Sequence, residues 1–179
     1  EVLIAAKHQS FFDAILIVSA VPKPKFIMKN SLKYAPVLGW FGLRIGCICV
    51  ERGKRTQAIK SMVAAVNSGN SPAGQLIIYP QGTRIAPGAS APYKIGTAVL
   101  YQETGQTCIP AATNVGVFWP KYGILRQPGL AVIEFLPAIQ PGLSNELFMH
   151  RLEEVIEQSS NALLEEAATD GFYPVGQDT

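Results

Sequence analysis

The sequence is poor in charge for its length, and neither sign of charge dominates. Of its 179 residues, 16% are charged and 48% are hydrophobic, and the formal net charge is +2. A net charge this small does not supply the basic surface that nucleic acid requires, so we expect no nucleic-acid partner. The low charge density fits a chain that places part of its surface in a bilayer or a lipid pocket, although a large core would explain it as well.

Long hydrophobic runs are also missing. The longest clean run, Ala14 to Val21, is far shorter than the roughly 20 residues that cross a bilayer as a helix. The chain has no initiator methionine and begins within a strand-like run, Val2 to Ala6. We therefore expect that an N-terminal segment, which would include a membrane anchor, precedes residue 1.

Cysteine is scarce, and its spacing does not suit a metal. Cys47, Cys49 and Cys108 are an odd number of thiols, and they lie in strand-like apolar runs. They lack the further cysteines or nearby histidines of a zinc site. We expect buried free thiols in a reducing compartment, with no metal and no redox cofactor.

The apolar pattern predicts one α/β domain over residues 1–179. Short apolar runs alternate with helical patterns, which favours a mixed, largely parallel sheet flanked by helices on both faces. Strands are expected at 2–6, 26–28, 46–50, 75–79, 108–113 and 130–135, the last of them buried on both faces. Helices are expected at 14–21, 31–43, 53–69 and 97–103, with a long one starting near 144.

A histidine and an aspartate lie at the first junction between a strand and a helix. His8 and Asp13 follow the strand 2–6, and the carboxyl ends of parallel strands are where ligands bind in open α/β folds. A histidine held by a carboxylate has a fixed tautomer and suits general-base chemistry near neutral pH. An ordinary hydrogen-bonded pair would look the same, but a second polar block, Tyr79 to Arg84, follows another strand end.

Four blocks in order resemble the glycerolipid acyltransferase family, in particular the bacterial 1-acyl-glycerol-3-phosphate acyltransferases. The first motif of that family, His, four residues, then Asp, is matched by His8 and Asp13. The third, aromatic-Pro-Glu-Gly-Thr-Arg, is matched by 79–84, with glutamine in place of glutamate. Weaker matches are 46–52 to the second motif and 109–111 to the fourth. The resemblance implies a glycerol-3-phosphate acyltransferase-like fold.

The resemblance also implies a mechanism. His8 would take the proton from the free hydroxyl of a lysophospholipid, and Asp13 would orient His8 and stabilise its protonated form. The hydroxyl would attack an acyl thioester of coenzyme A or acyl carrier protein directly, so no serine or cysteine nucleophile is needed. Ser10 is expected to cap the helix that follows.

A phosphate-bearing acceptor needs a cationic anchor. Arg84 and Arg52 are the main candidates, because a guanidinium can bind phosphate oxygens in a bidentate fork, and Lys94 is a third. For Arg52, which follows Glu51, an ordinary surface ion pair is a serious alternative. The substrate-binding residues that we expect are Arg52, Gln81, Gly82, Thr83, Arg84 and Lys94.

Three residues depart from the family pattern. Lys7 stands where asparagine is most frequent, and Cys49 stands in place of an aromatic residue. Gln81 replaces a glutamate, which removes a charge. If that carboxylate steadies an arginine or the acceptor, Gln81 weakens catalysis or shifts the acceptor. If it only holds the loop, Gln81 is a near-isosteric replacement.

The expected function is acyl transfer to 1-acyl-glycerol-3-phosphate, which gives phosphatidic acid in phospholipid biosynthesis. The alternatives are an acyltransferase for glycerol-3-phosphate or another lysolipid, and a catalytically weak lipid-binding relative. The family also implies attachment to the cytoplasmic face of a bacterial inner membrane. The missing N-terminal segment and the basic, aromatic helix 31–43 would contact the membrane surface, although an ordinary core helix fits the latter pattern equally well.

Overall fold

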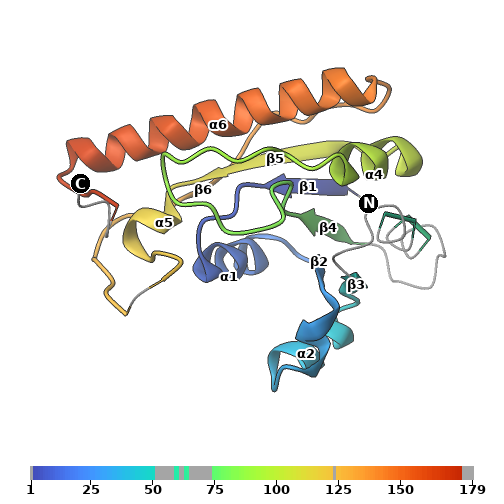
Figure 1. Cartoon of the computed structure of the whole chain (residues 1–179), viewed down its shortest axis with the longest axis horizontal. Helices are drawn as coiled ribbons and strands as arrows, with labels where there is room; N and C mark the ends of the chain where they lie inside the picture. Colours follow the sequence, from blue (N-terminus) through green and yellow to red (C-terminus); the bar gives the residue numbers. More distant parts are fainter. Residues whose placement is uncertain (1, 51–58, 61–62, 65–73, 123, 175–179) are drawn as a thin grey trace.

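A mostly parallel sheet forms the centre of the protein (Figure 1). The structure is a computed structural model that describes residues 2–50, 59–60, 63–64, 74–122 and 124–174. Over these residues the sheet has six strands in the order β3-β2-β4-β1-β5-β6. Neighbouring strands from β3 to β5 pair in parallel, and β6 pairs with β5 antiparallel. The strands are β1 (Val2–Ala6), β2 (Pro24–Lys29), β3 (Ile48–Val50), β4 (Gln75–Ile78), β5 (Cys108–Thr113) and β6 (Ile133–Phe135).

Helices cover both faces of the sheet, as the sequence predicts. Figure 1 shows α6 (Asn145–Thr169) along one face and α1 (Phe11–Ala20) on the other. Side chains alternate across β1, so Leu3 and Ala5 join the core under α6 while Ile4 and Ala6 join the core against α1. The helix α4 (Gly96–Thr104) packs against α6 and ends at Gly105, which adopts the left-handed conformation that glycine tolerates at a helix end.

The strand expected at 130–135 differs from the prediction. It is shortened to β6, it lies at an edge of the sheet, and Glu134 and Phe135 are exposed, so it is not buried on both faces. The continuous apolar character of this run suggested a central parallel strand. An antiparallel edge strand with one paired side does not need such a pattern.

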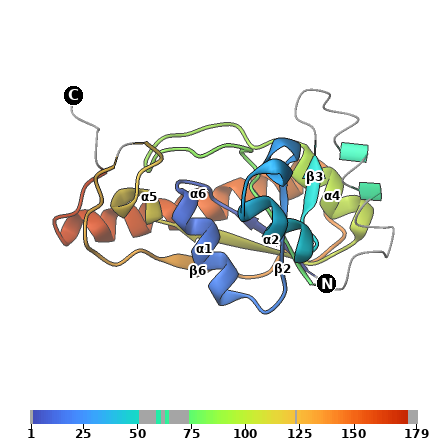
Figure 2. The same ribbon diagram turned by 90° about the horizontal axis from the view of Figure 1, so that it is seen from below.

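The helix expected at 31–43 is two short helices. A 3₁₀ helix, η1 (Asn30–Tyr34), and α2 (Leu38–Arg44) are separated at Pro36, which has no amide hydrogen and disfavours helical backbone in the residue before it. Figure 2 shows α1 and α2 on the side of the sheet opposite to α6. Tyr34 is 77% exposed and Trp40 61% exposed. This exposure rules out the alternative of an ordinary core helix.

The three cysteines are free thiols, but they are not all buried. Cys108 is buried in the core beneath α6, whereas Cys47 and Cys49 are half-buried beside β2 and in β3. Burial raises the pKa of Cys108 to about 12, and burial also raises the pKa of Cys47. These two thiols therefore remain protonated at neutral pH.

Two further expectations concern segments for which the structure gives little or nothing. The helix expected at 53–69 lies largely outside the described residues. The expected N-terminal membrane segment would precede residue 1. Among the helices that the structure does describe, none combines the length and the apolar character needed to cross a bilayer.

A buried ion pair ties the end of β1 to α6. The Nζ atom of Lys7, which is almost fully buried, lies 2.6 Å from both carboxylate oxygens of Glu157. The hydroxyl of Tyr93 donates a third hydrogen bond to Glu157 Oε1 at 2.8 Å. Burial of Tyr93, and then the charge of Glu157, raise the pKa of Tyr93 well above its ordinary value, so this hydroxyl stays a donor. Lys7, which departs from the family pattern, is thus a structural link to the opposite face of the sheet.

Removing Glu157 should destabilise the protein strongly. Glu157→Ala leaves the ammonium of Lys7 buried without its partner, which we expect to cost about 3 kcal/mol of unfolding free energy. Glu154→Ala, at an exposed position of the same helix, should change it by less than about 0.5 kcal/mol. The double variant Lys7→Met/Glu157→Leu should recover most of the loss. Urea denaturation measures all three, and equal effects of the two alanine variants would contradict the prediction.

Candidate active site

The candidate site lies at the carboxyl ends of two neighbouring strands in the middle of the sheet. β1 and β4 pair in parallel, His8 follows the end of β1 and Tyr79 follows the end of β4. The chain leaves β1 through α1 on one face, and later reaches β5 through α4 on the other face. A crevice between strands whose connections diverge in this way is where open α/β sheets bind ligands.

Asp13 occupies the first turn of α1 and is held by the backbone. Its Oδ2 atom accepts hydrogen bonds from the amides of Gln9 and Ser10, both at 2.8 Å. The hydroxyl of Ser10 in turn accepts a hydrogen bond from the Phe12 amide at 3.1 Å. The two residues form a reciprocal capping box, so the prediction that Ser10 caps this helix is confirmed.

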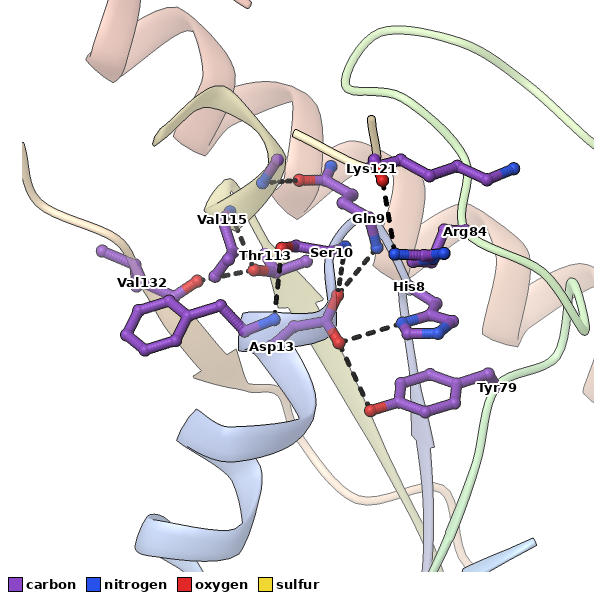
Figure 3. Close-up of polar contacts among 12 residues, drawn as sticks. His8, Gln9, Ser10, Asp13, Tyr79, Arg84, Thr113, Val115, Lys121 and Val132 are labelled. Carbon is purple, nitrogen blue, oxygen red and sulfur yellow. Dashed lines mark hydrogen bonds and ion pairs between the residues drawn. The ribbon is translucent and has the colours of Figure 1, made fainter. Parts of the chain in front are cut away.

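The imidazole of His8 faces this carboxylate. His8 Nδ1 lies 2.9 Å from Asp13 Oδ1 (Figure 3), the aspartate side chain is 0% exposed and the histidine side chain is 19% exposed. A carboxylate can only accept, so it places the ring hydrogen of neutral His8 on Nδ1. The lone pair is then on Nε2, at the opposite edge of a partly exposed ring, which is the arrangement that a general base needs.

Tyr79 contacts both members of this pair. Its ring stacks on the His8 ring with 3.8 Å between centroids and 14° between planes. Its hydroxyl donates to Asp13 Oδ1 over 3.4 Å, a long hydrogen bond. Burial, and then the charge of Asp13, raise the pKa of Tyr79 well above its ordinary value, so the phenol stays protonated.

The loop that follows β4 brings a guanidinium to the same side of the site. The Ile85 amide donates to the His8 carbonyl at 2.8 Å, which fixes this loop against the end of β1. Arg84 is half-buried, and its Nη1 atom donates to the Lys121 carbonyl at 3.4 Å. Figure 3 shows the Arg84 guanidinium and the His8 ring on the same side of Asp13.

Lys94, near the C-terminal end of the loop between β4 and α4, contacts residues at the start of that loop. Its amide donates to the Pro80 carbonyl at 2.9 Å, and its exposed side chain lies over Gly82. Gly82 has a φ of +68°, and a Cβ atom there would come within 2.5 Å of Lys94 Nζ. The backbone conformation therefore favours glycine at this position, whereas the exposed tip of the lysine could move aside for a Cβ atom.

Gln81 and Thr83 differ in their surroundings. Gln81 is buried, and its Nε2 atom donates to the Ala91 carbonyl at 3.4 Å, which connects the two ends of the loop. Its Oε1 atom is buried and has no hydrogen-bond partner among the described residues. Thr83 is exposed at the tip of the turn. Arg52 lies outside the described residues, so its predicted part in the site stays a prediction.

A protein-family comparison identifies the chain. A model of the family described as acyltransferase matches residues 1–114. The chain belongs to the acyltransferase family.

Two curated relatives share the same name for their activity. The 1-acyl-sn-glycerol-3-phosphate acyltransferase of Pseudomonas aeruginosa is 27% identical over 137 residues, which are 76% of this chain and 53% of that protein. The enzyme of the same name from Saccharomyces cerevisiae is 26% identical over 182 residues, covering 99% of this chain and 59% of that protein. The chain thus spans a little over half the length of these two relatives.

A solved structure agrees with the fold. The 1-acyl-sn-glycerophosphate acyltransferase of Thermotoga maritima superposes with a TM-score of 0.75 at 22% identity. The match covers 91% of this chain and 66% of that chain. At this identity the likeness shows a shared fold, and it confirms the mixed α/β architecture predicted from the sequence.

Some residues of the site were not singled out from the sequence. Tyr79 belongs to the third motif of the acyltransferase family, but the motif does not predict its contacts with His8 and Asp13. No sequence pattern points to Gln9, which is buried and whose Oε1 atom accepts from the Gly116 amide at 2.9 Å. The part that Asp13 plays in capping α1 could have been predicted, because an acidic residue three positions after Ser10 has the spacing of a capping box.

The described residues offer no obvious metal site. Nowhere in the described ranges do three or more His, Cys, Asp or Glu side chains gather closely enough to hold a metal ion. What the arrangement presents instead is an oriented imidazole, a buried carboxylate behind it, and cationic side chains from the loop that joins β4 to α4.

Proposed function

We propose that the protein transfers a fatty acyl group from an acyl thioester to the free hydroxyl of 1-acyl-glycerol-3-phosphate. The observation that carries the proposal is the His8–Asp13 pair, in which a buried carboxylate orients the imidazole of a partly exposed histidine. The names of the relatives from Pseudomonas aeruginosa and Saccharomyces cerevisiae support the choice of acceptor. Acyl coenzyme A and acyl carrier protein are both suitable donors of the thioester.

The proposed reaction is a single displacement through a tetrahedral intermediate. The acceptor hydroxyl attacks the thioester carbonyl while His8 Nε2 takes its proton, and Asp13 stabilises the resulting imidazolium without accepting the proton. The intermediate then collapses, the carbon–sulfur bond breaks, and the imidazolium returns the proton to the leaving thiolate. Ser10 is not a nucleophile in this scheme, because it is fully buried and its hydroxyl caps α1.

The acceptor phosphate would bind to the loop between β4 and α4. Arg84 lies near His8 and can offer further guanidinium hydrogens beyond the one that it gives to Lys121. Lys94 adds a second positive charge, and the left-handed turn at Gly82 lets the backbone approach a ligand closely. Thr83 is an additional exposed donor on the same turn, and Arg52 remains a candidate anchor from the second motif.

The surroundings of Gln81 favour a loop-holding part for this residue. Its side chain is buried and joined to Ala91, and burial of an ionised glutamate at this position would need charge compensation. A glutamine is therefore compatible with an active enzyme. Two alternatives would replace the main proposal. One is an acyltransferase that acts on another acceptor, such as glycerol-3-phosphate, and the other is a catalytically weak lipid-binding protein.

We further propose that α2 and η1 contact the membrane surface. Five apolar side chains of this region are more than half exposed, namely Tyr34, Val37, Trp40, Phe41 and Leu43. Cations accompany them: Arg44 lies over the Trp40 ring and Lys33 over the Tyr34 ring. An apolar surface with flanking cations is typical of interfacial elements on anionic bilayers. For an enzyme of bacterial phospholipid synthesis, this would be the cytoplasmic face of the inner membrane.

His8→Ala should abolish most acyl transfer. We expect kcat to fall by about 10³-fold, because the general base is lost. The measurement is release of free thiol from acyl coenzyme A or acyl carrier protein with lysophosphatidic acid as acceptor. His150→Ala is the matched control, since the other histidine of the chain is exposed on α6. Turnover that survives in His8→Ala removes His8 from the mechanism, and no acceptor-dependent turnover in the wild type favours a lipid-binding protein.

The loss of activity in Arg84→Ala should depend on whether the acceptor carries a phosphate. We expect kcat/KM to fall by about 100-fold for acceptors with a phosphate, because a charge-assisted hydrogen bond is lost, and to change little for monoacylglycerol. Arg151→Ala, on the exposed side of α6, should leave both kinds of acceptor unaffected. A panel of lysophosphatidic acid, glycerol-3-phosphate and monoacylglycerol provides the comparison. Equal losses for all acceptors would contradict a phosphate contact.

Trp40→Ser/Phe41→Ser should weaken membrane binding. Loss of two exposed aromatic rings should lower the affinity for vesicles containing anionic lipid by more than about tenfold. Leu147→Ser/Tyr173→Ser removes two exposed apolar side chains at the two ends of α6 and should have no such effect. Vesicle flotation measures the bound fraction. Unchanged flotation of the Trp40/Phe41 variant would exclude α2 as a membrane contact.

A further inference from the structure

Tyr79 is held between the candidate base and a residue of the next strand. On one side its ring stacks on His8, with centroids 3.8 Å apart. The ring of Phe26, from the strand β2 that pairs with the other side of β4, lies 6.2 Å from it at 25°. Turning the Tyr79 ring out of its plane would break the stack with His8, so Tyr79 presents a defined plane to the imidazole.

The hydroxyl of Tyr79 reaches the same carboxylate oxygen as the imidazole. Asp13 Oδ1 lies 2.9 Å from His8 Nδ1 and accepts the longer hydrogen bond from Tyr79 at 3.4 Å. Both contacts draw on the negative charge of one oxygen atom. The charge that Oδ1 presents to His8 is therefore lower than it would be without the phenol.

We propose that Tyr79 is a positioning residue for His8, whose ring fixes the plane of the imidazole and whose hydroxyl moderates its attraction to Asp13. The inference rests on the proposed function, in which His8 is the general base. A plane that limits rotation of the imidazole keeps Nδ1 directed at Asp13 and Nε2 directed outward. Only the neutral ring can accept a proton, so the strength of its interaction with Asp13 matters for a general base.

The two histidines of the chain make a direct test practical. With histidine-selective isotope labelling, nuclear magnetic resonance of ring nitrogens and carbons would show only His8 and His150, and exposed His150 serves as an internal reference. In the wild type, neutral His8 should be a single tautomer with the hydrogen on Nδ1. Among the described residues, the charged and titratable groups that the contacts place beside its ring are Asp13 on α1, Tyr79 after β4 and Arg84 on the following loop.

Tyr79→Phe keeps the aromatic plane and removes the hydroxyl. Asp13 Oδ1 then interacts with His8 alone, which favours the protonated ring. We expect the midpoint of the His8 titration to rise by about half a pH unit, because the lost hydrogen bond is long and weak. The acid limb of the pH profile of kcat should move to higher pH by the same amount.

Tyr79→Leu removes the plane as well. We expect the His8 signals to show two tautomers or exchange broadening, and kcat to fall by about tenfold while KM for the acceptor stays within about twofold. A contribution to folding alone would not produce this pattern in a variant that remains folded. If Tyr79→Leu fails to fold, the titration of Tyr79→Phe decides.

Tyr101→Phe is a matched control on the other face of the sheet. Tyr101 stacks on Phe148 with centroids 3.9 Å apart and 8° between planes, and its hydroxyl donates to the Gln140 carbonyl. Removal of this hydroxyl should lower stability and leave the His8 titration unchanged.

An unchanged His8 midpoint in Tyr79→Phe overturns the inference. The magnetic resonance readout needs no turnover, so failure of the acyl-transfer assay in the wild type would contradict the proposed function and leave this test intact.

Discussion

The Asp13 carboxylate is the interaction on which the rest of the site depends. It is fully buried, so its charge must be compensated by donors within the protein. Two backbone amides bind one oxygen, and the imidazole of His8 and the phenol of Tyr79 approach the other. Its position in the first turn of α1 also places it at the positive end of the helix dipole. One side chain thus begins a helix and orients the candidate base.

Strand pairing in the sheet brings the other residues of the site to Asp13. Parallel pairing of β1 with β4 brings residues that are about seventy positions apart, His8 and Tyr79, into ring contact at one edge. The loop after β4 is then fixed by a hydrogen bond from the Ile85 amide to the His8 carbonyl, which brings Arg84 to the same side. Backbone pairing between distant segments, rather than side-chain affinity, therefore determines which cations share a site with the base.

Local sequence signals predicted the parts of the structure that local physics determines. The capping serine at position 10, the long helix that starts near Ser144 and the helix predicted at 97–103 all follow from short-range rules, and all are present. The family motifs pointed to His8, Asp13 and Arg84, which the structure places on the same side of the sheet edge. The break at Pro36 is also a local effect, but the apolar pattern over 31–43 favoured one continuous helix. Tertiary context decided the rest: the edge position of β6 and the contacts of Tyr79 depend on which segments become neighbours. No pattern within a single stretch contains that information.

The alternation of side chains at the end of β1 has a consequence for changes in chain length. Lys7 continues the pairing with β5 through its amide and points to Glu157 on one face, while His8 points to Asp13 on the other. A one-residue deletion within β1 would move His8 to the position that faces Glu157 and Gln9 to the position that faces Asp13, whereas a one-residue insertion would move Lys7 to the position that faces Asp13. In neither case would an imidazole face Asp13. Neither the ammonium of Lys7 nor the amide of Gln9 has a basic lone pair to offer, so either change would leave the site without a base.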